Sequence, residues 1–267
     1  MSHAVPAPAA PEPIESAPAL PAAAEIPAPH CLNCHAALHG PFCAQCGQEH
    51  VEGPMPVRAY LADGMNTLFE WWDDKVPRSL WVLVRRPGLL TREFQAGRRV
   101  AWLLPWRLYF LVSVVFFLLV NLLDPVTTAS LGVQDMEAQR AEAMNRAIAD
   151  MLPALLLGVV PFFTIGVWGL HRRRHPYYMQ HLAFSFHYLA FVFLAFSVPV
   201  VVRAAWLWNV AMLGIYAYLV LALRQAYPQR AGAAAARAAV LFAYFWVLVL
   251  FAMVVGLMVA AIRTAVG

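Results

Sequence analysis

The chain has 267 residues and a net charge of +4, and 61% of its residues are hydrophobic while only 13% are charged. Soluble domains average roughly 45–50% apolar and 25% charged residues, so this composition excludes an ordinary soluble protein. A helix needs about 20 apolar residues to cross a hydrocarbon core of about 30 Å, and the sequence offers five such stretches. We therefore expect an all-α, multi-span integral membrane protein with about five transmembrane helices.

The first segment, residues 1–29, consists mainly of Ala and Pro with a few Glu. It has neither the basic cluster nor the apolar core of a secretory signal, and too few large apolar residues to pack. We expect a disordered leader that is partly polyproline.

Residues 30–50 contain the only cysteines of the chain, in the pattern C-x2-C-x8-C-x2-C. Two such pairs make two tight turns whose thiolates converge, and four thiolates satisfy the tetrahedral preference of zinc. A four-thiolate shell leaves no place for an activated water, so the predicted zinc is structural, although an iron site fits the same ligands. The predicted ligands of this small zinc ribbon are Cys31, Cys34, Cys43 and Cys46.

Other uses of the cysteines are less favoured. Disulfides do not persist in the reducing cytoplasm, where the charge distribution described below places this segment. A redox dithiol of the thioredoxin type needs one pair on a strand-to-helix turn, and no such pattern surrounds these two pairs. Four histidines lie nearby and are interpreted as solvated neighbours rather than ligands: His30, His35, His39 and His50.

Residues 51–103 predict amphipathic helices at the membrane surface. Apolar residues recur at helical spacing from Leu61 to Trp72, and a second short helix ends before Pro87. Arginines mixed with tryptophans follow up to Arg107, which is typical of a segment lying against anionic headgroups. The arginines expected to contact headgroups are Arg85, Arg86, Arg98 and Arg99.

Several short motifs together resemble a known family. These are "CGQ" at 46–48, an acidic pair followed by Lys75, "RPG" at 86–88, "GRR" at 97–99 and a first span begun by Pro105, with "YYMQHLAFSFH" further on. The combination resembles bacterial membrane proteins grouped as domain of unknown function 3667, over about residues 31–195. The resemblance implies a zinc-ribbon head on a multi-span domain of the bacterial inner membrane, and it implies no reaction.

The membrane domain is predicted to occupy residues 104–267. Only Arg203 separates the third and fourth spans, so they form a tight hairpin or one of them is re-entrant. The polar segment 124–150 reads as a loop with a helix in which Glu142 pairs with Arg146, either a solvated connector or an external binding element. The spans are expected at 104–123, 151–170, 182–202, 204–223 and 239–262.

Most of the 19 lysines and arginines precede the first span or lie in the loops after the second and fourth spans. Because basic residues stay on the cytoplasmic side, the amino terminus is expected in the cytoplasm and the carboxyl terminus outside, in the periplasm of a cell inner membrane.

No aspartate or glutamate follows Asp150, and no HExxH, GxSxG or phosphate-binding glycine loop is present. Intramembrane proteases and most proton-coupled carriers need a carboxylate within the bilayer, so an enzyme is disfavoured. The remaining candidates within the membrane are His181, His187 and Tyr188, of which Tyr188 shares a helical face with His181. They suit a proton relay or second metal site, or else simple interfacial hydrogen bonding.

Two functions follow from these expectations. The first is a non-enzymatic anchor or regulatory protein that presents the structural zinc ribbon to a protein partner, with membrane lipid as its other partner. The second is a small transporter or channel that uses His181 and His187. Binding of nucleic acid is disfavoured because residues 31–48 contain no Lys or Arg to neutralise phosphates.

Overall fold

The computed structural model describes residues 30–50, 74–123 and 138–266, with the side chains of 138–140 and 263–266 left aside. Within these ranges the secondary structure is helical, with two isolated β-bridges and no strand. The predicted all-α fold is confirmed. The predicted leader, residues 1–29, and the predicted amphipathic stretch from Leu61 to Trp72 lie outside the described residues. The helices are α2 (Lys75–Arg85), α3 (Leu89–Gln95), α4 (Pro105–Leu123), α5 (Ala138–His171), α6 (Tyr178–Val202), α7 (Ala205–Ala226) and α8 (Ala231–Val266).

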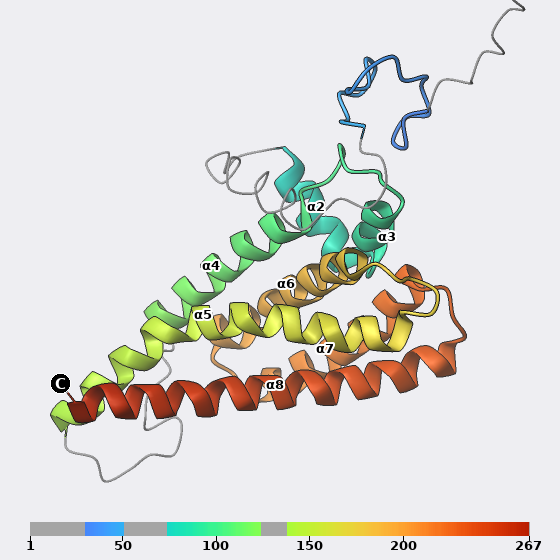
Figure 1. Ribbon diagram of the computed structural model, residues 1–267. Coiled ribbons are helices and arrows are strands. Elements are labelled where there is room, and N and C mark those ends of the chain that lie inside the picture. Colours follow the sequence, from blue (N-terminus) through green and yellow to red (C-terminus); the bar gives the residue numbers. More distant parts are fainter. Residues whose placement is uncertain (1–29, 51–73, 124–137, 267) are drawn as a thin grey trace, which may run out of the picture.

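Five of these helices, α4 to α8, are long and apolar enough to cross a membrane, which confirms the predicted multi-span architecture. The bundle they form is visible in Figure 1, where α5 and α8 run side by side over most of their lengths. Helices α5 and α8 extend furthest beyond their predicted spans, because the hydropathy pattern marks apolar residues and not the helix itself. The candidate spans are Pro105–Leu123, Ala141–His171, Tyr178–Val202, Ala205–Ala226 and Ala231–Ile262.

The segment 138–150, predicted to form a separate polar helix within a loop, is helical but forms the first part of α5, continuous with the second span. It contains no Gly or Pro, and its Glu142 carboxylate is ion-paired with Arg146 one turn later, as expected. The fifth span likewise begins at Ala231 rather than at 239, because "AGAAAARAA" is mostly alanine, the best helix former.

The third and fourth spans form a hairpin. α6 ends at Val202, Arg203 takes a left-handed conformation with φ 59°, and α7 begins at Ala205. At 1.5 Å per residue, helices of this length reach more than about 30 Å, so each can cross the hydrocarbon core completely. Complete crossing by both helices, or a re-entrant course for one of them, stays a prediction.

α6 lies at the centre of the bundle and contacts α3, α4, α5 and α7. In the most apolar stretch of α6, 56% of the residues are buried inside the protein, compared with 22–33% in the other four spans. The outer faces of those spans carry large exposed apolar side chains, as lipid contact requires. Examples are Leu118, Leu122, Leu213, Val247 and Phe251.

Two short helices, α2 and α3, pack on one end of the bundle together with the loop that leads to α4. We call residues 75–103 the platform. The Tyr218 hydroxyl of α7 donates a hydrogen bond of 2.9 Å to the Leu83 carbonyl at the end of α2. Gly88, which precedes α3, lies so close to α7 that a Cβ there would sit 2.5 Å from the Ala222 carbonyl oxygen. The platform is thus fixed to the membrane domain.

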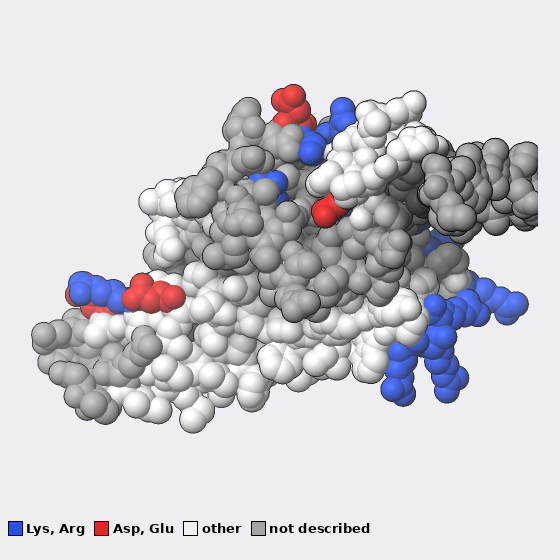
Figure 2. Space-filling view, turned by 45° about the horizontal axis from the view of Figure 1, so that its top comes forward, with Lys and Arg blue, Asp and Glu red and all other residues white. Residues whose placement is uncertain are grey.

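The helix ends near the platform form what we call the arginine end, where α4, α6 and α8 begin and α5 and α7 end. Basic side chains extend from one end of the bundle in Figure 2, with no acidic side chain beside them on the face in view. The loops at the arginine end supply Arg172, Arg173, Arg174 and Arg230, and the last turn of α7 supplies Arg224.

Candidate metal centre and its docking loop

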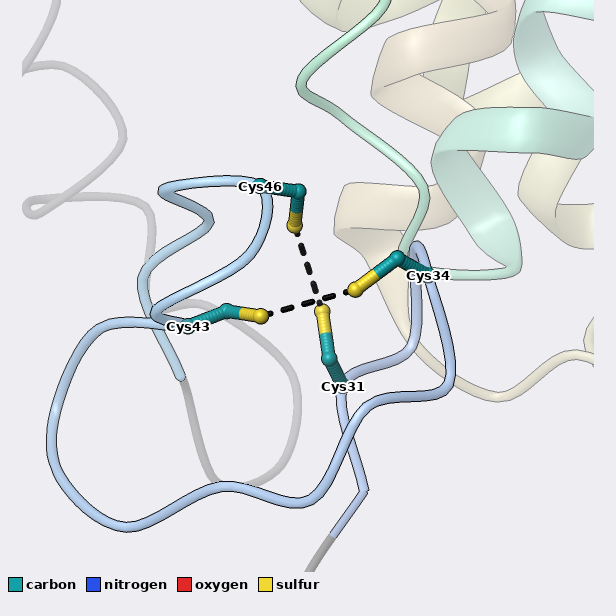
Figure 3. A group of neighbouring side chains, drawn as sticks. All are labelled: Cys31, Cys34, Cys43 and Cys46. Atoms are coloured by element: carbon teal, nitrogen blue, oxygen red, sulfur yellow. Dashed lines mark hydrogen bonds between the residues drawn. The ribbon is translucent and has the colours of Figure 1, made fainter.

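The four cysteines converge in the ribbon, which we define as residues 30–50. Their sulfur atoms all lie within 4.8 Å of one another (Figure 3). The shortest distances, 3.5 Å, join Cys31 to Cys46 and Cys34 to Cys43, so the two turns face each other. Four sulfurs at about 2.3 Å from a tetrahedral ion lie about 3.8 Å apart, and a disulfide needs about 2.05 Å. The thiols are free and spaced to hold a metal ion.

The two turns have the same hydrogen-bonding pattern, displaced by twelve residues. The Cys31 N–H donates to the Ala36 carbonyl, and the Cys43 N–H donates to the Gln48 carbonyl. After the second cysteine of each turn, the backbone is left-handed, with φ 63° at His35 and φ 72° at Gly47. Gly47 takes this conformation readily because it has no Cβ, whereas His35 adopts it although it has a side chain. This repeated turn directs both sulfurs of each pair inward.

The turns favour thiolates unequally. Backbone N–H groups of Cys46 and Gln45 lower the pKa of Cys43 to about 7, and N–H groups of its own turn also lower the pKa of Cys31. At Cys34 the Ala36 N–H favours the thiolate, but burial and the neighbouring thiols outweigh it and raise the pKa to about 12. Adjacent thiolates repel each other, so a divalent cation is needed for all four to ionise.

None of the nearby histidines joins the cysteine cluster. His30, His35 and His39 are exposed and His50 is half-buried, and the grouped ligand atoms are the four cysteine sulfurs. The arrangement therefore matches a four-thiolate shell without an open position, as the spacing predicted.

The ribbon docks on the loop between α3 and α4 through the side chain of Gln48. The Gln48 Nε2 donates to the Gly97 carbonyl at 2.8 Å, and the Oε1 accepts the Arg99 N–H at 3.1 Å. The side-chain amide of Gln48 thus bonds one backbone C=O and one backbone N–H of the loop, as the backbone of an adjacent β-strand would. Gly97 has φ 76°, and a Cβ there would lie 2.5 Å from the Leu32 side chain. The positive φ and the close approach to Leu32 both favour glycine at position 97, because any other residue would add a Cβ.

The four arginines predicted to contact headgroups fall into two groups. Arg85 and Arg86 are exposed, and the Arg85 guanidinium lies 4.5 Å from the Trp81 ring centroid. Arg98 and Arg99 are half-buried beneath the ribbon. A headgroup role for all four stays a prediction, with Arg85 and Arg86 the more accessible pair.

Arg98 has a protein partner inside the platform. Its guanidinium forms two bonds with the Glu93 carboxylate, at 2.5 and 2.7 Å. These bonds hold the pKa of Glu93 below its ordinary value and raise the pKa of Arg98. The Arg99 guanidinium stacks 5.2 Å from the Phe94 ring centroid. Both arginines therefore shape the loop on which the ribbon docks.

His187 lies in the interior of the molecule, where α3 packs against α6. It is 4% exposed, and its Nδ1 lies 2.9 Å from the hydroxyl of Thr91 on α3. Tyr188 is also buried and stacks on Phe163, at a ring distance of 5.3 Å. Thr91 was not identified from the sequence, because it lies 96 residues away and no local pattern connects the two.

His181 is completely buried and bonded through both ring nitrogens. Its Nδ1 lies 2.8 Å from the Tyr227 hydroxyl, and its Nε2 lies 2.9 Å from the His175 carbonyl. The carbonyl only accepts, so Nε2 carries the proton and Nδ1 accepts from Tyr227. His181 and His187 therefore contact different partners and do not form one cluster. Tyr227, which follows α7, was missed because nothing in its surroundings marks it.

The platform is also where comparison with known proteins gives a result. Residues 73–117 match the family model described as "Protein of unknown function (DUF3667)". This match confirms the resemblance predicted from the sequence, over a segment that includes "RPG", "GRR" and the start of α4. No curated protein and no solved structure matches the chain significantly. The matched segment is thus mainly the platform and docking loop, rather than the cysteines or the later spans.

Proposed function

We propose that this multi-span membrane protein is a non-enzymatic anchor that holds a structural zinc ribbon at the cytoplasmic face for recognition by a protein partner. The observation that carries the proposal is the closed group of four sulfurs within 4.8 Å, mounted through Gln48 on a platform packed against the spans. The ion we propose is zinc, because four thiolates satisfy its tetrahedral preference, although iron fits the same ligands. When protein thiolates fill all four ligand positions, the ion stabilises the fold of the ribbon and has no position left for a reacting water.

The orientation supports this role. The arginine end carries most of the basic loop residues, and basic loops stay on the cytoplasmic side of the membrane. The ribbon docks beside this end, so its thiols face the reducing compartment that favours metal binding over disulfides. The carboxyl terminus follows a fifth crossing and is then periplasmic.

Phe42 is the side chain we expect the partner to contact. It is 60% exposed and directly precedes Cys43. Aromatic residues are enriched in binding hot spots. The ribbon has no Lys or Arg from 31 to 48, which favours a protein over nucleic acid as the partner.

The experiment uses a photocrosslinking residue at position 42 of the full chain in membranes. A single crosslinked protein band is expected, and it disappears when a chelator removes the metal. Phe42→Ser should lose the partner while keeping zinc and insertion, and Gln45→Ala, an exposed neighbour on the same turn, is the matched control. Cys43→Ser should lose both zinc and partner but still insert. Crosslinking that persists in Cys43→Ser would show that the folded ribbon is not what the partner recognises.

The transporter alternative remains a separate hypothesis based on His181 and His187. It requires that alanine at either histidine removes a flux while the protein still accumulates. The burial of both side chains and their bonds to Tyr227 and Thr91 favour a packing role instead.

A further inference from the structure

A cavity of about 910 Å³ lies at the arginine end, outside the metal centre. Its wall is formed by the end of α5, the loop to α6, the turn between α7 and α8, and the start of α8. Four arginines line it, and neither Asp nor Glu does: Arg173, Arg174, Arg230 and Arg237. No acidic residue exists in the chain after Asp150, so these elements have no carboxylate to offer. The cavity is therefore strongly cationic.

One of the arginines is held in place. Arg237 is half-buried on α8, and its guanidinium donates to the side-chain oxygen of Gln229 in the turn before α8. The Gln229 amide nitrogen in turn donates to the Leu223 carbonyl at 3.3 Å. The guanidinium is thus fixed by a neutral amide, and its charge is not cancelled. Such a fixed fork suits the oxygens of a phosphate.

A buried histidine in the cavity wall points to a ligand independently. His171 is 6% exposed and stacks on Tyr227, at a ring distance of 4.2 Å. Its Nδ1 lies 3.0 Å from the Val167 carbonyl and must donate to it, whereas its Nε2 is buried with no partner among the described residues. Native proteins seldom leave such an atom unpaired. A neutral His171 would accept a hydrogen bond from a hydroxyl at Nε2, and a protonated one would donate to an oxyanion.

The start of α8 adds a third feature. This helix begins at Ala231, and its first N–H groups have no acceptor within the helix. Arg230 and Ala233, on either side of this start, line the cavity. A helix start of this kind favours phosphate through its N–H groups and its dipole.

We propose that this cavity binds a phosphate group whose ligand also offers a hydroxyl. The arginines and the start of α8 take the charged oxygens, and His171 Nε2 takes the hydroxyl. The site lies at the ends of membrane-spanning helices, where an acidic phospholipid headgroup is present, and inorganic phosphate from the cytoplasm has the same chemistry. A second cavity, of about 680 Å³, shares Pro228 and Gln229 with it and is lined by Arg86, Arg92 and Arg224.

The test measures the melting temperature of the full chain in nonionic detergent while one of three ligands is added. These are short-chain phosphatidylglycerol, inorganic phosphate, and short-chain phosphatidylcholine as the zwitterionic control. A ligand that binds the folded state raises the melting temperature in proportion to RT ln(1 + [L]/Kd). Stabilisation by phosphatidylglycerol alone assigns a lipid headgroup, and stabilisation by inorganic phosphate as well assigns a soluble anion.

Variants localise the effect. Arg237→Gln should weaken binding about tenfold or more, because it removes a charge-assisted hydrogen bond. His171→Phe keeps a ring against Tyr227, removes the nitrogens and should weaken binding several-fold. Arg172→Gln is the matched control. Arg172 is exposed in the loop between α5 and α6, next to the cavity-lining Arg173, but it does not line the cavity itself and its guanidinium lies near the Trp168 ring. The proposal is overturned if neither anion stabilises the chain more than phosphatidylcholine, or if Arg172→Gln weakens binding as much as Arg237→Gln.

Discussion

Replacing Gln48 by alanine should release the ribbon from the platform while leaving its metal in place. The side chain forms hydrogen bonds of 2.8 Å to the Gly97 carbonyl and 3.1 Å from the Arg99 N–H, and the substitution removes both bonds. At a net value of about 0.5–1.5 kcal/mol for each bond, docking weakens by about 1–3 kcal/mol, or about fivefold to 150-fold. The metal stays because Gln48 contributes only its carbonyl to the turn of Cys43.

Hydrogen–deuterium exchange of the zinc-loaded full chain provides the assay. The Arg99 amide should exchange faster in Gln48→Ala by about the same factor, with zinc content unchanged. Gln48→Glu is the matched variant, because a carboxylate still accepts from the Arg99 N–H but cannot donate to the Gly97 carbonyl. It should leave Arg99 partly protected. The reasoning is refuted if Arg99 exchanges equally in the parent and in Gln48→Ala, because the side chain then contributes nothing to docking.

Three further predictions concern the metal, the platform and the core. Zinc affinity should fall as pH is lowered, because protons compete for the four thiolates, and it should fall more steeply below about 7, where the Cys43 thiolate is protonated as well; a zinc titration at several pH values measures this. Glu93→Gln should destabilise the chain by about 1 kcal/mol at neutral pH, from the lost bonds to Arg98. The folded-state pKa of Glu93 is lowered, so its contribution to the free energy of unfolding is complete above the unfolded-state pKa and is lost as pH falls through the folded-state pKa. The melting temperatures of the parent and of Glu93→Gln should therefore converge in acid. Thr91→Val should cost about 1–3 kcal/mol by leaving His187 unpaired, and a double-mutant cycle with His187→Phe should show strong non-additivity; additive effects would mean that the two side chains do not interact.

The features that could be predicted from the sequence are those set by local pattern. Five apolar stretches identify five spans because each crossing needs its own run of apolar residues. The paired cysteines predict their own convergence, since each pair lies within one tight turn and Gly47 marks the end of the second. The segment 138–150 shows the limit of predicting helix ends from hydropathy. The apolar stretch begins only after this polar segment, but its helix-forming residues extend α5 back to Ala138.

The contacts that assemble these pieces could not be predicted in the same way. Gln48 meets Gly97 across 49 residues and Thr91 meets His187 across 96. Such pairs depend on how α2, α3 and α6 pack, and single residues carry no signal of that packing. The motifs "CGQ" and "GRR" were recognised only as a resemblance. The structure gives a physical reason for both, because the glutamine of one bonds the backbone of the other.

The lengths of the two longest spans have a consequence for the choice of bilayer. The apolar candidate span of α8 has 32 residues, or about 48 Å of helix, against a hydrocarbon core of about 30 Å. A helix this long tilts, thickens the bilayer around it or extends into the headgroup region, and α5 packs along it. The cationic cavity lies between the end of α5 and the start of α8. We therefore expect hydrophobic mismatch to change the tilt of α5 and α8, which form the cavity walls. Membrane thickness would then alter the shape of the site that binds the phosphate group.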